Sequence, residues 1–152
     1  METITKLTFT TICYVTEDIE LVKQCVLNLL PDVNRDMQIN QFFSTSQFGD
    51  RIVIISIVIE NDLVNPVLGY LSTQLSENDK QYLFRHFSKR IDLDEKSFYL
   101  RLDKFKLLTN EFSLTEGSDV VKVEIGYSIF TPSQNTEDNI RDLLLTSGLI
   151  SE

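Results

Sequence analysis

Hydrophobic and polar residues alternate along several short stretches of the chain, and these stretches predict strands. Residues 3–15, TITKLTFTTICYV, are rich in threonine, β-branched and aromatic residues and predict a first strand. A weaker strand is predicted over 37–45. Residues 52–59, IVIISIVI, are apolar on both faces apart from Ser56, which is typical of a covered strand inside a sheet. We therefore expect this third strand to be central and covered on both sides.

Two more strands are predicted in the second half of the chain. Residues 98–105, FYLRLDKF, alternate with a period of two, as a strand with one buried face does. One face would carry Phe98, Leu100 and Leu102, and the other Tyr99, Arg101, Asp103 and Phe105. Residues 120–130, VVKVEIGYSIF, alternate in the same way and predict a half-buried strand that follows a turn at 116–119.

Helices are predicted between these strands. Thr16 is the predicted N-cap of a helix that ends before Pro31, with acidic residues in its first turn. Asn65 and Pro66 predict the start of a second helix, and SEND at 76–79 predicts the start of a third. A last amphipathic helix follows Thr136.

The order of these elements predicts an α+β fold, with a largely antiparallel sheet, helices packed on one face and an appended C-terminal helix. We expect a single domain over 1–131, followed by a linker and the amphipathic helix over 132–152. If helices cover only one face of the sheet, the other face needs the C-terminal helix or another subunit. This predicts a homodimer.

Composition supports a globular protein without disulfides. The chain has 152 residues, enough to bury a substantial core. No apolar run approaches the ~20 residues that span a bilayer, and the N-terminus has no signal-peptide pattern. We therefore expect a cytoplasmic protein that does not enter membranes. Cys13 and Cys25 lack metal-ligand spacing and are interpreted as small core residues.

Charge is distributed unevenly along the chain. The formal net charge of −9 argues against a general binder of DNA, other polyanions or acidic membranes. Between Lys80 and Lys106, however, eight basic residues stand against four acidic ones, while the rest of the chain has 6 basic and 19 acidic residues. The sequence therefore predicts a basic island on an acidic body, with a solvated helix and strand as the alternative.

Catalytic signatures are scarce. The single histidine, His86, is interpreted as a surface or packing residue, and none of the five glycines lies in a phosphate-binding loop. Asp92, Asp94 and Asp103 could converge on Mg²⁺. We favour turn roles for Asp92 and Asp94, and for Asp103 an ion pair with a cation such as Arg90 or Arg101. We expect no catalytic residues, no metal site and no cofactor.

Two longer stretches resemble a known family. VTEDIELVKQCVLNLLP, after the first strand, and RIDLDEKSFYLRLDKF, before the final hairpin, resemble small archaeal proteins described as predicted exosome-associated RNA-binding proteins, a family of unknown function. The resemblance runs from about Thr3 to Phe130. It implies a fold similar to large-subunit ribosomal protein five and a non-enzymatic role, as an accessory to RNA processing or degradation. The positions that match the family motif are Arg90, Tyr99, Arg101, Asp103 and Lys104.

Two hypotheses about function follow. In the first, the basic island binds RNA phosphates, Asp103 orients a guanidinium by bidentate pairing, and Tyr99 stacks on an unpaired base. The expected RNA-binding residues are Lys89, Arg90, Tyr99, Arg101, Lys104 and Lys106. In the second, the protein is a homodimeric interaction or scaffold protein whose charged strand forms an internal ion-pair network and binds no nucleic acid.

Overall fold

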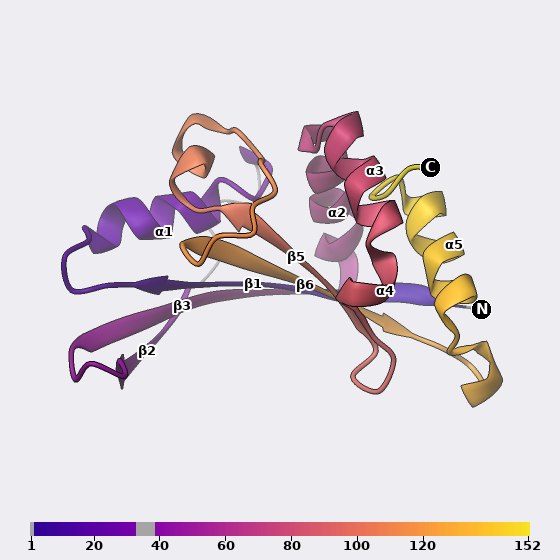
Figure 1. Cartoon of the computed structure of the whole chain (residues 1–152), viewed down its shortest axis with the longest axis horizontal. Helices are drawn as coiled ribbons and strands as arrows, with labels where there is room; N and C mark the ends of the chain where they lie inside the picture. The colour runs from indigo at the N-terminus through magenta and orange to yellow at the C-terminus, as the bar shows by residue number, and fades with distance from the viewer. Residues whose placement is uncertain (1, 33–38) are drawn as a thin grey trace.

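A single antiparallel sheet is the frame of the molecule. A computed structural model describes residues 2–32 and 39–152, so residues 37 and 38 of the predicted second strand lie outside the described residues. The strands are β1 (Thr3–Cys13), β2 (Asn40–Thr45), β3 (Arg51–Glu60), β4 (Ile91–Asp92), β5 (Ser97–Asp103) and β6 (Val120–Ser128). They form a six-stranded sheet in the order β2-β3-β1-β6-β5-β4 (Figure 1).

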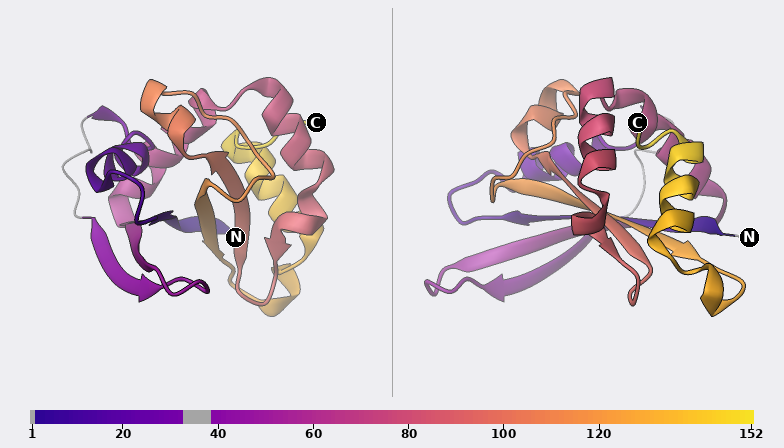
Figure 2. Two further views of the ribbon diagram at one scale, coloured as in Figure 1. Left: turned by 60° about the vertical axis from the view of Figure 1, so that its left-hand side comes forward. Right: turned by 45° about the vertical axis from the view of Figure 1, so that its right-hand side comes forward.

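The helices pack on one face of this sheet. They are α1 (Ile19–Leu27), α2 (Val64–Gln74), α3 (Glu77–Arg85), α4 (Phe87–Arg90) and α5 (Glu137–Ser147), with 3₁₀ turns η2 (Asn61–Leu63), η3 (Phe105–Thr109) and η4 (Pro132–Gln134). Figures 1 and 2 show α1, α2, α3 and α5 on the same side of the strands, with the other side of the sheet open. The predicted α+β class, with helices on one face and a C-terminal helix, is confirmed. No helix in the described part of the chain is both long and apolar enough to cross a bilayer.

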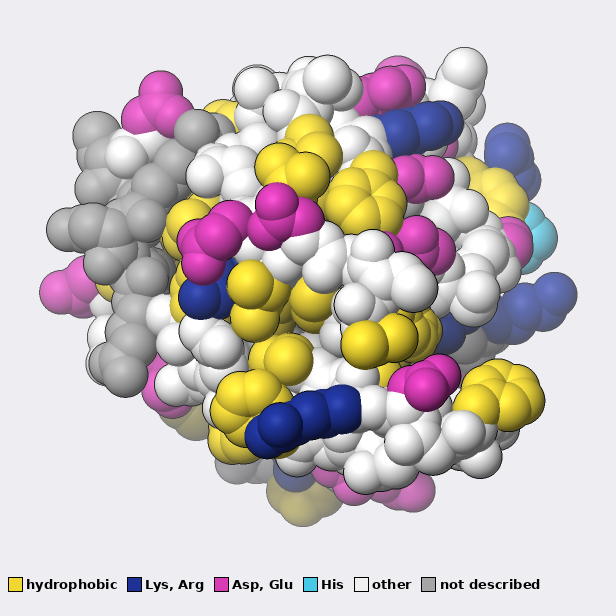
Figure 3. Space-filling model, turned by 90° about the vertical axis from the view of Figure 1, so that its left-hand side faces the viewer, with side chains coloured by type: hydrophobic (Ala, Val, Ile, Leu, Met, Phe, Trp, Pro, Cys, Tyr) yellow, Lys and Arg dark blue, Asp and Glu magenta, His cyan; other side chains and the backbone are white. Residues whose placement is uncertain are grey.

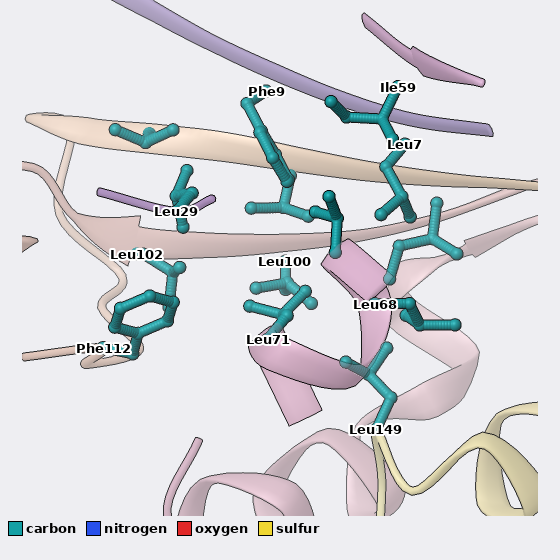
Figure 4. Close-up of a cluster of buried hydrophobic side chains, with 14 of the residues drawn as sticks. Leu7, Phe9, Leu29, Ile59, Leu68, Leu71, Leu100, Leu102, Phe112 and Leu149 are labelled. Atoms are coloured by element: carbon teal, nitrogen blue, oxygen red, sulfur yellow. The ribbon is translucent and has the colours of Figure 1, made fainter. Parts of the chain in front are cut away.

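The core fills the space between the sheet and the helices. Leu7 and Phe9 of β1, Ile59 of β3 and Leu100 of β5 are fully buried and lie near Leu71 of α2 (Figure 4). These strand residues belong to the alternating apolar positions of the sequence, because successive side chains of a strand point to opposite faces. The apolar surface on the helix-facing side of the sheet is therefore continuous from β3 to β5.

The expectation that residues 52–59 form a strand covered on both sides was wrong. In β3, Ile55, Ile57 and Ile59 are completely buried under the helices. On the opposite face Ile52 and Ser56 are also buried, but Ile54 and Val58 are only partly buried. The strand lies inside the sheet between β2 and β1. Among the residues that the structure describes, no helix lies over its second face (Figures 1 and 2).

Two helix starts also differ from the predictions. The N-cap of α1 is Asp18, whose carboxylate accepts a hydrogen bond of 2.9 Å from the backbone N–H of Glu20, so Thr16 is not the cap. Helix α2 begins at Val64, directly after η2, which places Pro66 inside its first turn. Thr16 and Asp18 are both suited to capping, and local sequence did not decide between them. The N-cap of α2 is Leu63, which makes no side-chain capping bond.

The C-terminal helix lies on the covered side of the sheet. Thr136 is its N-cap, as predicted, and accepts a hydrogen bond of 3.2 Å from the backbone N–H of Asn139. Ile140 and Leu144 are buried in the common core, and so is Leu149 beyond the helix. Helix α5 therefore does not cover the open face. The division of the chain into a domain and an appended tail stays a prediction.

Candidate nucleic-acid interface

The polar side of β5 lies on the open face of the sheet. Arg101 is exposed and lies opposite Lys122 of β6, and Tyr99 lies opposite Glu124. The ammonium of Lys122 is 4.5 Å from the centre of the Tyr99 ring, a cation–π contact. We call these four residues the open-face patch. The predicted alternation of β5 is confirmed, since Phe98, Leu100 and Leu102 are all fully buried on the other side.

Tyr99 is neutral throughout the physiological pH range. Partial burial raises the pKa of its phenol, and a hydrogen bond to Glu124 raises it further. Tyr99 is partly exposed, and the Lys122 ammonium lies over its ring. The patch therefore presents an aromatic ring and two cations beside one carboxylate.

A basic hollow adjoins this patch at the end of β5. It has a volume of about 260 Å³. Its walls are formed by Tyr82 and His86 at α3, Lys89 and Arg90 of α4, Arg101 of β5 and Glu116 of the β5–β6 connection. The structure thus brings three of the predicted RNA-binding residues, Lys89, Arg90 and Arg101, into one place. We call this site the basic hollow.

Glu116 orients Arg90 within the hollow. One oxygen of Glu116 accepts hydrogen bonds from the Arg90 guanidinium at 2.8 Å and from the Tyr82 hydroxyl at 2.6 Å. The hydroxyl and the guanidinium together lower the pKa of Glu116. The Arg90 guanidinium also lies 5.5 Å from the centre of the Tyr82 ring. Arg90 is thus fixed by its neighbours, while Lys89 and Arg101 are exposed and free of this bracing.

Lys104 lies inside the protein and away from the solvent. Its side chain is 1% exposed. The ammonium donates to the carbonyl of Ile12 at 2.9 Å, to Glu17 at 2.9 Å and to Asp119 at 2.7 Å. All three donors of the ammonium therefore have acceptors. Burial opposes the charge, but the bonds to Asp119 and Glu17 outweigh it and raise the pKa of Lys104.

Lys106 and Asp103 lie where β5 passes into η3. Lys106 is exposed, on a turn that packs against α1 on the covered side of the sheet. The Asp103 carboxylate accepts a hydrogen bond of 3.2 Å from the backbone N–H of Lys106. The structure thus separates Lys104 and Lys106 from the basic hollow. Pairing of Asp103 with Arg101 stays a prediction.

A second hollow lies at the end of the sheet where β1 finishes. It has a volume of about 200 Å³. Its walls include Thr10, Tyr14, Arg101, Asp119 and Lys122, and we call it the sheet-end hollow. Figure 3 shows this end of the molecule, where basic and acidic side chains lie among hydrophobic side chains that reach the surface. Arg101 lines both hollows and so connects them.

Sequence reasoning missed Lys122 and His86 as members of this surface. Lys122 lies outside the basic island in sequence, but it alternates with the apolar residues Val121 and Val123. That pattern places it on the polar face of its strand, and β5 and β6 form an antiparallel pair. Matching the polar faces of the two neighbouring strands would have identified the open-face patch.

Asp92 has a local role in the β4–β5 turn. Asp92 accepts a hydrogen bond of 3.1 Å from the backbone N–H of Glu95, which confirms its predicted turn role. Within residues 2–32 and 39–152, no three histidine, cysteine or acidic side chains come together as metal ligands.

Comparisons with known proteins place the chain in a family. A family model described as RNA binding matches residues 6–127. The RNA-binding protein PAB1135 of Pyrococcus abyssi is 29% identical over 123 residues, which cover 79% of each chain. The uncharacterized protein MJ0213 of Methanocaldococcus jannaschii is 23% identical over 135 residues, or 88% of this chain and 90% of that one.

Solved structures agree on the fold. Protein AF2318 of Archaeglobus fulgidus, described as belonging to family DUF54, superposes with a TM-score of 0.81 at 20% identity, over 95% of this chain and 99% of that one. Mth689 of Methanothermobacter thermautotrophicus, described as a DUF54 protein, has a TM-score of 0.73 at 18% identity, over 93% and 98%. Since the family model spans most of the sequence, the chain belongs to this RNA-binding family.

Proposed function

We propose that this protein binds RNA, with the basic hollow and the open-face patch as its phosphate-contacting surface. Membership of an RNA-binding family supports RNA as the partner, as does the similarity to a Pyrococcus abyssi protein named for RNA binding. The observation that carries the site is the position of Arg101. It is exposed, it lines the basic hollow with Lys89 and Arg90, and it lies opposite Lys122 on the open face.

A local site of this kind is compatible with an acidic protein. The net charge of −9 repels a polyanion at long range. At physiological ionic strength, however, exposed charges farther apart than about 8 Å are largely screened from each other. Once RNA is bound, the attraction between its phosphates and the cations of the basic hollow is therefore stronger than the screened repulsion from distant acidic residues. We include an accessory role in RNA processing or degradation in this proposal.

Replacing Arg101 by alanine tests the site directly. A hydrogen bond to a charged group contributes about 1.5–3 kcal/mol, so we expect the dissociation constant for a short fluorescent RNA to rise by about tenfold or more. The urea midpoint should not change, because the side chain is exposed. Fluorescence anisotropy and urea unfolding measure the two effects. Lys122→Ala should also raise the dissociation constant for RNA.

Arg51→Ala is the matched control. Arg51 is also an exposed arginine, but it lies at the start of β3 with its guanidinium 4.5 Å from the Phe43 ring centre. Arg51→Ala changes the net charge of the protein by the same amount as Arg101→Ala. Equal losses for Arg51→Ala and Arg101→Ala would attribute binding to overall charge and reject the site.

About four phosphate contacts also predict a slope of about −3 for the logarithm of the binding constant against the logarithm of the salt concentration, for a single strand. Binding that does not depend on salt would therefore contradict the proposal.

A second candidate function is that of a homodimeric interaction protein. On the open face, the partly buried Ile12 and Ile54 lie in one cross-strand row with Phe42, which is 57% exposed. This apolar row has no covering layer within the described residues. If a second copy covers it, sedimentation equilibrium should show a dimer that Phe42→Ser dissociates. A wild-type protein that stays monomeric at high concentration would exclude this function.

A further inference from the structure

We infer that the RNA bound by this protein has an unpaired nucleotide, and that its base stacks on an aromatic platform formed by Tyr14 and Phe105. This inference rests on the proposed RNA-binding function and names the class of RNA. The two residues are 91 positions apart in sequence, and each residue is 38% exposed. Tyr14 also lines the sheet-end hollow, together with Arg101 and Lys122.

The buried Lys104 holds the two rings in place. Its ammonium lies 5.2 Å from the centre of the Tyr14 ring and 5.1 Å from the centre of the Phe105 ring. Both distances are within the range of a cation–π contact. The ammonium is itself bonded to Ile12, Glu17 and Asp119, and these three acceptors fix its position. The rings are therefore anchored from inside the protein, and their exposed parts remain accessible from solvent.

An anchored aromatic ring beside cations suits an unpaired nucleotide. Bases of single-stranded RNA stack on aromatic side chains, and this contact does not depend strongly on sequence because every base has a π face. Bases inside a duplex are paired and stacked on each other, so they cannot reach a protein ring. Arg101 and Lys122, which line the same hollow as Tyr14, supply the donors for the neighbouring phosphate.

The local charge is compatible with this ligand although two carboxylates are present. Glu17 and Asp119 are both bonded to Lys104, so that group carries a net charge of −1. Arg101 and Lys122 raise the sum for the sheet-end site to +1. Lys104 thus offsets one of the two negative charges that would otherwise repel a phosphate.

The test compares a single-stranded RNA with a blunt duplex of the same sequence, using the full chain. We expect the single strand to bind more tightly than the duplex. Tyr14→Leu and Phe105→Leu remove the ring but retain apolar bulk, and each should weaken single-strand binding about fivefold or more. Tyr14→Phe should retain binding. Phe130→Leu is the matched control. Phe130 is 80% exposed and follows the end of β6, which pairs with the start of β1, whereas Tyr14 follows the end of β1.

Inorganic polyphosphate, a polyanion without bases, separates stacking from charge. The leucine variants should bind polyphosphate as the wild type does, whereas Arg101→Ala should bind it more weakly. Equal affinity for duplex and single strand, or full RNA affinity in both leucine variants, would overturn the platform and leave the proposed function standing. If neither form of RNA binds, the proposed function fails and the platform fails with it.

Discussion

Replacing Lys104 by methionine is expected to lower the free energy of unfolding by about 3–5 kcal/mol, the usual cost of removing one partner of a buried ion pair. The substitution keeps most of the side-chain volume but removes the ammonium that joins the Ile12 carbonyl, Glu17 and Asp119. Glu17 is largely buried and would lose its cation. Urea unfolding measures the loss, and the fold should be much less stable at neutral pH.

Lys106→Met is the control for this prediction. Lys106 lies two residues away and is exposed, so the same chemical change there should alter stability by less than about 0.5 kcal/mol. The pKa of Lys104 is raised in the folded protein. The stability linked to this shift is therefore fully present at a pH below the pKa of the unfolded chain. It is lost only as the pH rises through the pKa of the folded protein. The difference between wild type and Lys104→Met should therefore stay constant from pH 7 to pH 9, both below the ordinary lysine value of 10.5. A loss no larger than that of Lys106→Met would show that the ammonium is not buried.

Replacing Phe98 by alanine should cost about 3–5 kcal/mol as well, because truncation of a buried phenylalanine leaves a cavity. Phe98 of β5 is completely buried and stacks on Phe87 of α4, with ring centres 5.2 Å apart. This contact holds α4, which carries Lys89 and Arg90, against the strand that carries Arg101. Urea unfolding should show a large drop in midpoint.

Two further variants serve as controls for Phe98→Ala. Phe98→Leu retains part of the packing and should cost less than Phe98→Ala. Phe130→Ala removes an exposed ring and should be close to neutral. If Phe98→Ala were as stable as Phe130→Ala, the packing of α4 on β5 would be incorrect. The basic hollow would then lack the support described above.

Strand faces could be read from local sequence alone. The alternation in β5 identified Phe98, Leu100 and Leu102 as buried, and it placed Tyr99 and Arg101 on the other side. This worked because side-chain direction in a strand depends only on odd or even position. The same period did not show whether the second face of β3 was covered, since coverage depends on elements elsewhere in the chain.

The sequence predicted only in part which residues of the basic island come together. Lys89, Arg90 and Arg101 meet in the basic hollow, whereas Lys104 is buried. Nothing in the neighbourhood of Lys104 marks it as different from Lys106. Its partner Glu17 lies 87 residues away, and the acid beside Arg90 proved to be Glu116, 26 residues away.

Residue types and their periodicity thus established the α+β class, the inward faces of the strands and the region richest in cations. Which cations reach solvent was decided only when β1, β5 and the connection before β6 came together. Periodicity is a property of neighbours in the chain and is available without folding. The exposure of a charged group depends on the acceptors that surround it, and for Lys104 all of those acceptors come from distant positions brought close by the sheet.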